Sequence, residues 1–144
     1  MNAEIRFKDK RILETLEFID ENFYAAGANN DKIMYSGNGL EWDYILLDKT
    51  RNIISITGDH LVVNRGQITS KNLYLLDYNN AEVIVIDLET KEITKIINFA
   101  SYLPGNEYYG LCIAVEDLQN FTTNTITVYC IVDVLYKVTI DLYT

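Results

Sequence analysis

The last twenty residues, TITVYCIVDVLYKVTIDLYT (125–144), carry an apolar or aromatic side chain at every even position from Ile126 to Leu142. Alternation with a period of two indicates a β-strand with one buried face. No Gly, Pro or Asn interrupts the run, so the usual turn residues are missing. We therefore expect one unbroken strand whose even-numbered face lines the interior of the protein.

A straight strand of this length would extend beyond the body of the protein. Residues 125–142 would span about 60 Å at ~3.3 Å per residue, whereas a domain of this length has a diameter of roughly 37 Å. A two-residue hairpin loop would shift the apolar parity by one, and the parity does not shift. We expect a continuous, strongly coiled strand in a curved sheet; alternatively, its end reaches another chain.

The odd-numbered face of this strand is mixed in character. Asp133 stands between Ile131 and Leu135. It lies either in water at the rim of the sheet or buried with a partner, because a lone buried carboxylate is too costly.

Near the N-terminus the apolar spacing indicates a helix instead. Apolar side chains recur at intervals of four, three and four residues, at Ile12, Leu16, Ile19 and Phe23. Three glutamates would fall on the opposite side of such a helix, namely Glu14, Glu17 and Glu21. This pattern predicts an amphipathic α-helix from Lys10 to Ala26 that packs its apolar stripe on a sheet.

From Glu41 onward, short strand patterns alternate with short polar turns. The expected strands are Trp42–Leu47, Ile53–Thr57, Leu61–Val63, Asn72–Asp77, Glu82–Leu88, Ile93–Ile97 and Tyr108–Val115. Turns this short favour antiparallel pairing, because parallel strands need crossovers of a dozen or more residues. The predicted fold class is α+β, mainly β, in a single domain over 1–144. One N-terminal helix packs on a curved, mostly antiparallel meander sheet, half-barrel or sandwich-like, which ends in the long coiled strand.

Two segments, ILLDKTRNIISI (45–56) and IVIDLETKEITKI (84–96), share an apolar run followed by Asp, Thr and a basic residue. Similar hairpins occur in four-stranded propeller blades, at a period near forty residues. After a front helix, a chain of 144 residues leaves too little for a closed propeller. We attribute the likeness to turn chemistry, because Asp and Thr hydrogen-bond the backbone in turns.

The formal charge of −9 narrows the choice of partner. It disfavours binding to nucleic acid or to an anionic membrane, and it favours a basic partner or simple solubility. The start, MNAEIRFKDK, has no secretory apolar core, and no run approaches 18 apolar residues. Cys112 and Cys130 lie within strand patterns. We expect a cytoplasmic protein with buried, reduced thiols.

Residues that usually carry catalysis are few. His60 is the single histidine, and Asp59 beside it points to the other face of a strand. No metal-ligand spacing occurs, and neither cysteine has a plausible base nearby. A glycosidase-like carboxylate pair is conceivable, but nothing singles out two of the 21 acids. We predict no catalytic residue, no metal and no cofactor.

Acidic and aromatic residues adjoin at three places near expected strand ends. The candidate partner-binding residues are Glu41, Trp42 and Asp43, then Glu107, Tyr108 and Tyr109, then Glu116 and Asp117. Stiff aromatic side chains in an acidic field are typical of interface anchors that face a basic partner. Alternatively, Trp42 and Tyr44 point into the core while the acids stay in water.

These features favour a small cytoplasmic binding module, bacterial or phage, that neutralises a basic protein. Immunity proteins act on nuclease toxins in this way, because a nuclease cleft is positive where it holds phosphates. One alternative is a half-barrel carrier or enzyme for a small ligand. Another is an acidic secretion chaperone, although such chains close with a helix. We expect a monomer or homodimer that binds neither nucleic acid nor membranes.

Overall fold

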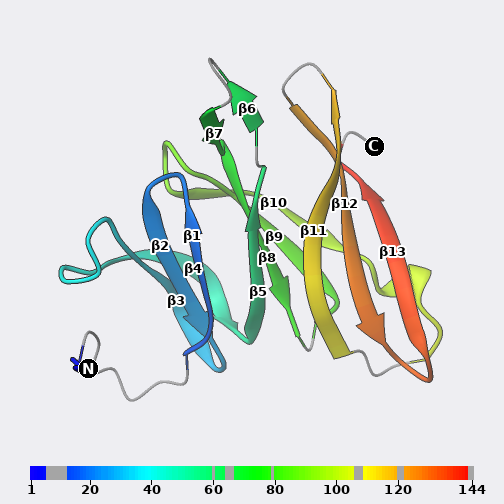
Figure 1. The fold of residues 1–144 in the computed structure, drawn as a ribbon. Coiled ribbons are helices and arrows are strands. Elements are labelled where there is room, and N and C mark those ends of the chain that lie inside the picture. The colour runs from blue at the N-terminus through cyan, green and yellow to red at the C-terminus, as the bar shows by residue number, and fades with distance from the viewer. Residues whose placement is uncertain are drawn as a thin grey trace.

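In a computed structural model, the chain forms three antiparallel sheets and one small hairpin (Figure 1). The structure describes residues 1–5, 13–59, 61–63, 67–78, 80–105, 109–119 and 122–142. The first sheet contains β1 (Leu13–Ile19), β2 (Asn22–Gly27), β3 (Asn30–Ser36) and β4 (Asp43–Arg51). The middle sheet contains β5 (Ile53–Gly58), β8 (Asn72–Asp77), β9 (Glu82–Asp87) and β10 (Glu92–Asn98). The third sheet contains β11 (Tyr109–Gln119), β12 (Thr122–Ile131) and β13 (Leu135–Asp141), and β6 (Leu61–Val63) pairs with β7 (Gln67–Thr69).

The central strands β8 and β9 of the middle sheet are buried on both faces, whereas its edge strand β10 is mostly exposed. On β8, Leu73 and Leu75 pack against the first sheet, whereas Tyr74 and Leu76 pack against the third. Strands covered on both sides have near-continuous apolar sequences, as LYLL in β8 and VIVI in β9 do. The protein therefore has two apolar cores. The first core lies between the first and middle sheets, and the second core lies between the middle and third sheets.

The three sheets are arranged like consecutive blades of a β-propeller (Figure 1). Their first strands lie side by side, since β5 contacts β1 on one side and β11 on the other. A Cβ atom added to Gly58 would lie 2.8 Å from Cγ2 of Ile19, so the close approach of β5 to β1 needs a glycine there. The expectation of one curled sheet, half-barrel or sandwich-like, is thus wrong.

The predicted N-terminal helix is also wrong, because the residues from Leu13 to Ala26 form most of the β1–β2 hairpin. Asp20 and Glu21 have positive φ angles of 49° and 66°, and Ile19 pairs with Asn22 across this two-residue turn. Such turns match the right-handed twist of paired strands. The apolar stripe assigned to one helix face is divided between the two faces of a sheet, since Ile19 is buried in a core and Leu16 is 60% exposed on the opposite face. Residues 10–12 lie outside the described part.

The C-terminal segment is a hairpin and not one unbroken ribbon. The chain reverses over 132–134, and Ile131 pairs with Leu135. A loop of three residues joins positions four apart, so even residues pair with even ones and the apolar parity continues through the turn. The predicted inward face is correct on the two strands, where Ile126, Val128 and Val138 are buried, and it fails in the turn, where Val134 is 58% exposed.

Asp133 is the middle residue of this reversal and is exposed. Its carboxylate accepts a hydrogen bond from the backbone N–H of Val134 at 2.9 Å. A hydrogen bond from the hydroxyl of Tyr136 holds the pKa of Asp133 below its ordinary value. Of the two positions considered for Asp133, the wet one is confirmed, and the residue helps to form a turn that lacks Gly, Pro and Asn.

The two similar segments have different roles. The segment 45–56 runs from β4 into β5 and joins two sheets, whereas 84–96 forms the β9–β10 hairpin. Asp87 accepts hydrogen bonds from the backbone N–H groups of Glu89 and Thr90 at 2.8 and 3.0 Å, as turn chemistry predicts. Asp48 instead bonds the side chain of Arg51. The likeness therefore does not mark a structural repeat.

Antiparallel pairing, predicted from the short turns, is confirmed in every sheet. The bounds predicted for Leu61–Val63 and Asn72–Asp77 are those of β6 and β8. Among the described residues, no helix has the length and apolar character needed to cross a bilayer. Cys130 is a buried thiol, as expected.

Candidate docking surface

The outer face of the first sheet exposes large apolar side chains. Leu16 and Phe18 on β1 are 60% and 59% exposed, and Tyr44 and Leu46 on β4 are 50% and 60% exposed. They belong to one face because strand residues alternate and cross-strand partners share a side. We call this surface the outer apolar face and define it by Leu16, Phe18, Phe23, Ala25, Met34, Trp42, Tyr44 and Leu46.

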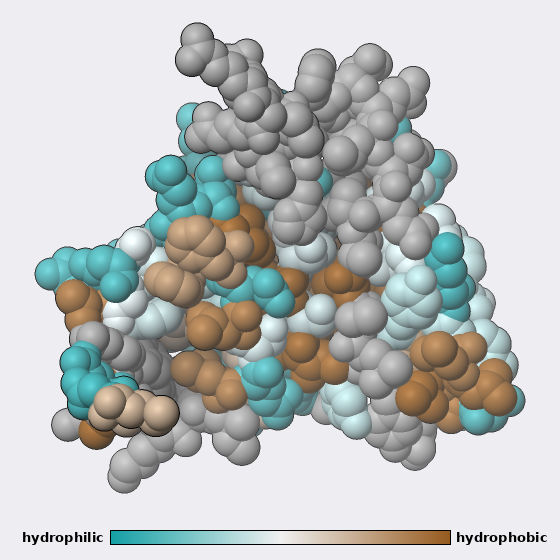
Figure 2. All heavy atoms as spheres, in the orientation of Figure 1, coloured by the Kyte–Doolittle hydropathy of each residue, from teal (hydrophilic) through white to brown (hydrophobic). Residues whose placement is uncertain are grey.

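Strand register builds this face as rows across the sheet. Leu16 pairs with Ala25, Ala25 with Met34, and Met34 with Tyr44. In the next row the rings of Phe18 and Phe23 lie 4.9 Å apart between centroids. Figure 2 shows apolar side chains gathered over β1 and β2 on the surface. Soluble proteins rarely leave a contiguous patch of this kind uncovered without a use for it.

A groove of about 370 Å³ lies within the outer apolar face. Its lining residues are Leu13, Glu14, Thr15, Leu16, Ala25, Met34 and Trp42. Ala25 is 3% exposed and forms the small floor between Leu16 and Met34. Of the described residues that line the groove, Glu14 alone is charged.

The sheet that carries this face is acidic. Residues 13–51 hold eight carboxylates and three basic side chains, a formal charge of −5 within the −9 of the whole chain. Of the three bases, Arg51 is buried, and the ammonium of Lys32 lies 4.8 Å from the ring centroid of Tyr44. The first sheet as a whole thus carries a net negative charge, although Lys32, the strand partner of Leu46, lies on the outer apolar face itself.

The loop before β4 positions the first group of predicted residues, Glu41, Trp42 and Asp43. The hydroxyl oxygen of Ser36 accepts a hydrogen bond from the backbone N–H of Gly39 at 2.8 Å. The side-chain oxygen of Asn38 accepts from the N–H groups of Leu40 and Glu41 at 2.8 and 3.0 Å. These bonds hold the loop next to the groove, where Glu41 is exposed and Trp42 is half-buried.

Asp43 lies beside Tyr35 at the edge of the same sheet. Its carboxylate accepts hydrogen bonds from the backbone N–H of Tyr44 at 2.8 Å and from the hydroxyl of Tyr35 at 3.5 Å. Burial, followed by the charge of Asp43, raises the pKa of Tyr35. Neither Trp42 nor Tyr44 is part of the two cores. The alternative in which both point into the core is therefore wrong.

Three of the other predicted residues lie on a different sheet. Tyr109, Glu116 and Asp117 lie on β11 in the third sheet, on the far side of the middle sheet. The side chains of these three residues, and Glu107 and Tyr108 altogether, lie outside the described part. The rim predicted from three clusters reduces, within the described residues, to the cluster at Glu41–Asp43.

Sequence reasoning missed Leu16, Phe18 and Leu46 as surface residues. Leu16 was placed on the buried stripe of a helix, and Leu46 within a strand expected to have one covered face. The sequence does carry a signal for these exposed residues, because an uninterrupted apolar run such as YILL (44–47) puts apolar side chains on both faces of a strand. Such a run predicts cover on both faces, and the described part of the chain covers only the inner face of the first sheet.

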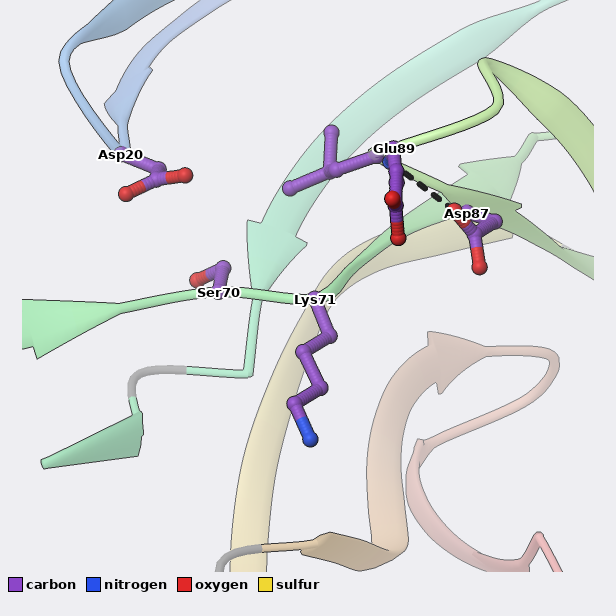
Figure 3. A pocket seen from close by; sticks show the side chains of 6 residues that line it. Asp20, Ser70, Lys71, Asp87 and Glu89 are labelled. Carbon is purple, nitrogen blue, oxygen red and sulfur yellow. Dashed lines mark hydrogen bonds between the residues drawn. The ribbon is translucent and has the colours of Figure 1, made fainter. Parts of the chain in front are cut away.

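A second pocket, of about 400 Å³, lies where the first and middle sheets meet (Figure 3). Asp20, Lys71, Asp87 and Glu89 give it a charged lining, with Lys71 extended away from Asp20. Backbone N–H donors from Thr90 and then Glu89 hold the pKa of Asp87 below its ordinary value. The backbone N–H of Leu88 donates to the carbonyl of Lys71 at 2.9 Å, so two of the loops that line this pocket are bonded to each other, and we assign it a structural role.

A buried ion cluster connects the first sheet to the middle sheet. Arg51, 2% exposed, donates to Asp77 and Glu82 at 3.0 Å and to Asp48 at 2.8 Å. Burial alone would lower the pKa of Arg51, but hydrogen bonds to the three carboxylates outweigh it and raise that pKa. Asp77 is fully buried, so this cluster is part of the fold and not of the surface.

Within the described residues, no group of three or more His, Cys, Asp or Glu side chains is placed to hold a metal ion. No protein-family model matches the sequence, and no curated protein matches it either. The outer apolar face is therefore the feature of the protein that bears most directly on function.

Proposed function

We propose that this protein is a small acidic binding module that neutralises a basic partner protein through the outer apolar face. The observation that supports this most is the exposure of Leu16, Phe18, Tyr44 and Leu46 on one face of a sheet with a formal charge of −5. Protein interfaces combine apolar anchors at the centre with polar and charged groups around them. The negative field selects a partner of positive charge and speeds the encounter with it.

Among such modules, we assign the protein to the immunity class, which inhibits nuclease toxins in the cytoplasm of a bacterial cell. A nuclease must hold phosphate groups, so its active cleft is positive and suits an acidic cover. The protein would act by binding and not by catalysis. The apolar groove fits this function better than a carrier role, because it is one part of a larger exposed face.

The direct test is purification of the protein from its native host, followed by identification of whatever binds it. We expect a basic protein with nuclease activity that is inhibited in the complex. The affinity should fall as salt concentration rises, because charge pairs across the interface are screened. Neutral or acidic partners would overturn the proposal, and a basic partner without nuclease activity would overturn the immunity assignment.

Two double variants test whether the partner binds the outer apolar face. Leu16→Ser with Leu46→Ser removes two exposed anchors and should weaken binding about tenfold or more. Lys137→Ser with Thr139→Ser changes two exposed residues of the third sheet and should leave the affinity unchanged. Equal losses from the two double variants would place the interface elsewhere.

A further inference from the structure

The groove in the outer apolar face has the form of a socket for one side chain. In the row Leu16–Ala25–Met34–Tyr44, alanine is the one small residue. Its neighbours stand above it, and Trp42 lines the same hollow. Ala25 is 3% exposed and forms the floor of this hollow, which has a volume of about 370 Å³.

The lining selects the chemistry of the occupant. Leu13, Leu16, Met34 and Trp42 offer apolar contacts, and Glu14 supplies a negative charge at the side. An apolar side chain that enters this hollow removes apolar surface from water, at ~25 cal/mol for each Å² buried. A base next to that side chain in the partner would face the Glu14 carboxylate. Among the described lining residues, none carries a positive charge.

Charge argues against a second copy of this chain as the occupant. Two first sheets facing each other would bring together two formal charges of −5. The third sheet, residues 109–142, has four carboxylates and one lysine, so it too would repel the first sheet of another copy. Like charges across an interface oppose association, whereas a basic partner compensates them.

We infer that the groove binds one apolar or aromatic side chain of the basic partner, with an adjacent Lys or Arg paired to Glu14. This inference rests on the proposed function and names the anchor that the partner must present. Buried aromatic side chains that fill a pocket are the usual source of most of the binding energy at an interface.

The single tryptophan of the chain reports on this site, because Trp42 lines the groove. The probe is the peptide Lys-Lys-Phe-Lys-Lys, whose phenylalanine does not interfere with tryptophan emission. We expect a saturable change in Trp42 fluorescence that weakens with salt. The matched peptides Lys-Lys-Ser-Lys-Lys and Glu-Glu-Phe-Glu-Glu should give no saturable change. A response that is equal for the phenylalanine and serine peptides would show charge attraction alone and overturn the inference.

Two variants test the socket itself. Ala25→Leu fills the hollow from its floor and should reduce peptide affinity about tenfold or more, since the anchor no longer fits. Glu14→Gln, at an exposed position that does not endanger folding, should lower the affinity and reduce its dependence on salt. Circular dichroism and thermal unfolding confirm that both variants are folded. Unchanged affinity in both would contradict the inference.

The identified partner separates this inference from the broader proposal. If Leu16→Ser with Leu46→Ser weakens the natural complex while Ala25→Leu does not, the face is correct and the socket is wrong. If neither weakens it, the proposed function fails as well. A change in Trp42 emission with protein concentration alone, without peptide, would show that a second copy fills the groove and would also overturn the inference.

Discussion

The first and third sheets end the stack of sheets at opposite sides, and their outer faces differ in chemistry. On β13 the outward positions carry exposed polar side chains, at Lys137, Thr139 and Asp141. On the first sheet the outward positions of β4 carry exposed Tyr44 and Leu46. Both strands bury their other residues in a core. The same alternation thus produces one face suited to water and one suited to a partner.

Charge does not distinguish these two sheets, because both are acidic. The difference lies in where apolar groups are exposed. In the third sheet, the large exposed apolar residues among the described ones are Ile131, Val134 and Leu135, at the β12–β13 reversal. In the first sheet they extend over the face from β1 to β4. A turn can be apolar without inviting a partner, whereas a flat apolar face is costly in water.

The largest loss of stability should come from removing Arg51, which connects the first sheet to the middle sheet. Arg51→Ala would leave the buried Asp77 without the guanidinium that balances its charge, and should cost about 3–5 kcal/mol of unfolding free energy. Denaturant unfolding measures this loss. Lys49→Ala, at an exposed cation 3.9 Å from Glu82, is the matched control and should cost less than about 1 kcal/mol. Similar losses from the two variants would show that Arg51 does not connect the sheets.

Adjacent residues of β4 offer a direct comparison of the inner and outer faces. Ile45→Ala creates a cavity in the first core and should reduce the free energy of unfolding by about 2–5 kcal/mol. Leu46→Ala, one residue later on the outer face, should change it by less than about 0.5 kcal/mol. Chemical denaturation of both variants checks the difference. A large loss for Leu46→Ala would mean that its face is covered within the protein itself.

The loop that holds Trp42 should contribute less to stability than Arg51 or Ile45 does. Ser36→Ala removes the acceptor for the backbone N–H of Gly39 and should cost about 1 kcal/mol. The fluorescence of Trp42 should shift at the same time, since the loop positions the groove wall. Thr139→Ala, on the polar outer face of the third sheet, should alter neither stability nor emission. A stable variant with unchanged emission would show that Ser36 does not order this loop.

The smallest change in stability should appear at low pH and should come from Asp48. The hydrogen bond from Arg51 lowers the pKa of Asp48 below its ordinary value of 3.8. A depressed folded-state pKa means that Asp48 contributes stability above pH 3.8, and that this contribution is lost as the pH falls through the lower folded-state value. Asp48→Asn should therefore flatten the acid limb of the curve of stability against pH. Urea unfolding at several pH values measures it, and an unchanged acid limb would contradict the assignment.

Parity was the part of the fold that the sequence determined well. The even positions of the C-terminal segment face a core, apart from Val134 in the turn, and the segments that contain LYLL and VIVI form strands as expected. The reversal at Asp133 was not predictable from parity, because a three-residue loop and an unbroken strand give the same alternation. The β1–β2 hairpin was hidden for a related reason. Leu16 and Ile19 fit a helical stripe as well as they fit opposite faces of a strand.

By itself, the sequence determined which residues of the C-terminal strands share a face, that neighbouring strands run antiparallel, and that the protein is acidic. It also placed Glu41, Trp42 and Asp43 together, because they are adjacent in the chain. Only the tertiary structure decided that the strands divide into three sheets, and that the middle sheet lies between the other two. The outer apolar face remains exposed because the apolar side chains on both faces of the first sheet need two layers of cover, and the described fold supplies one.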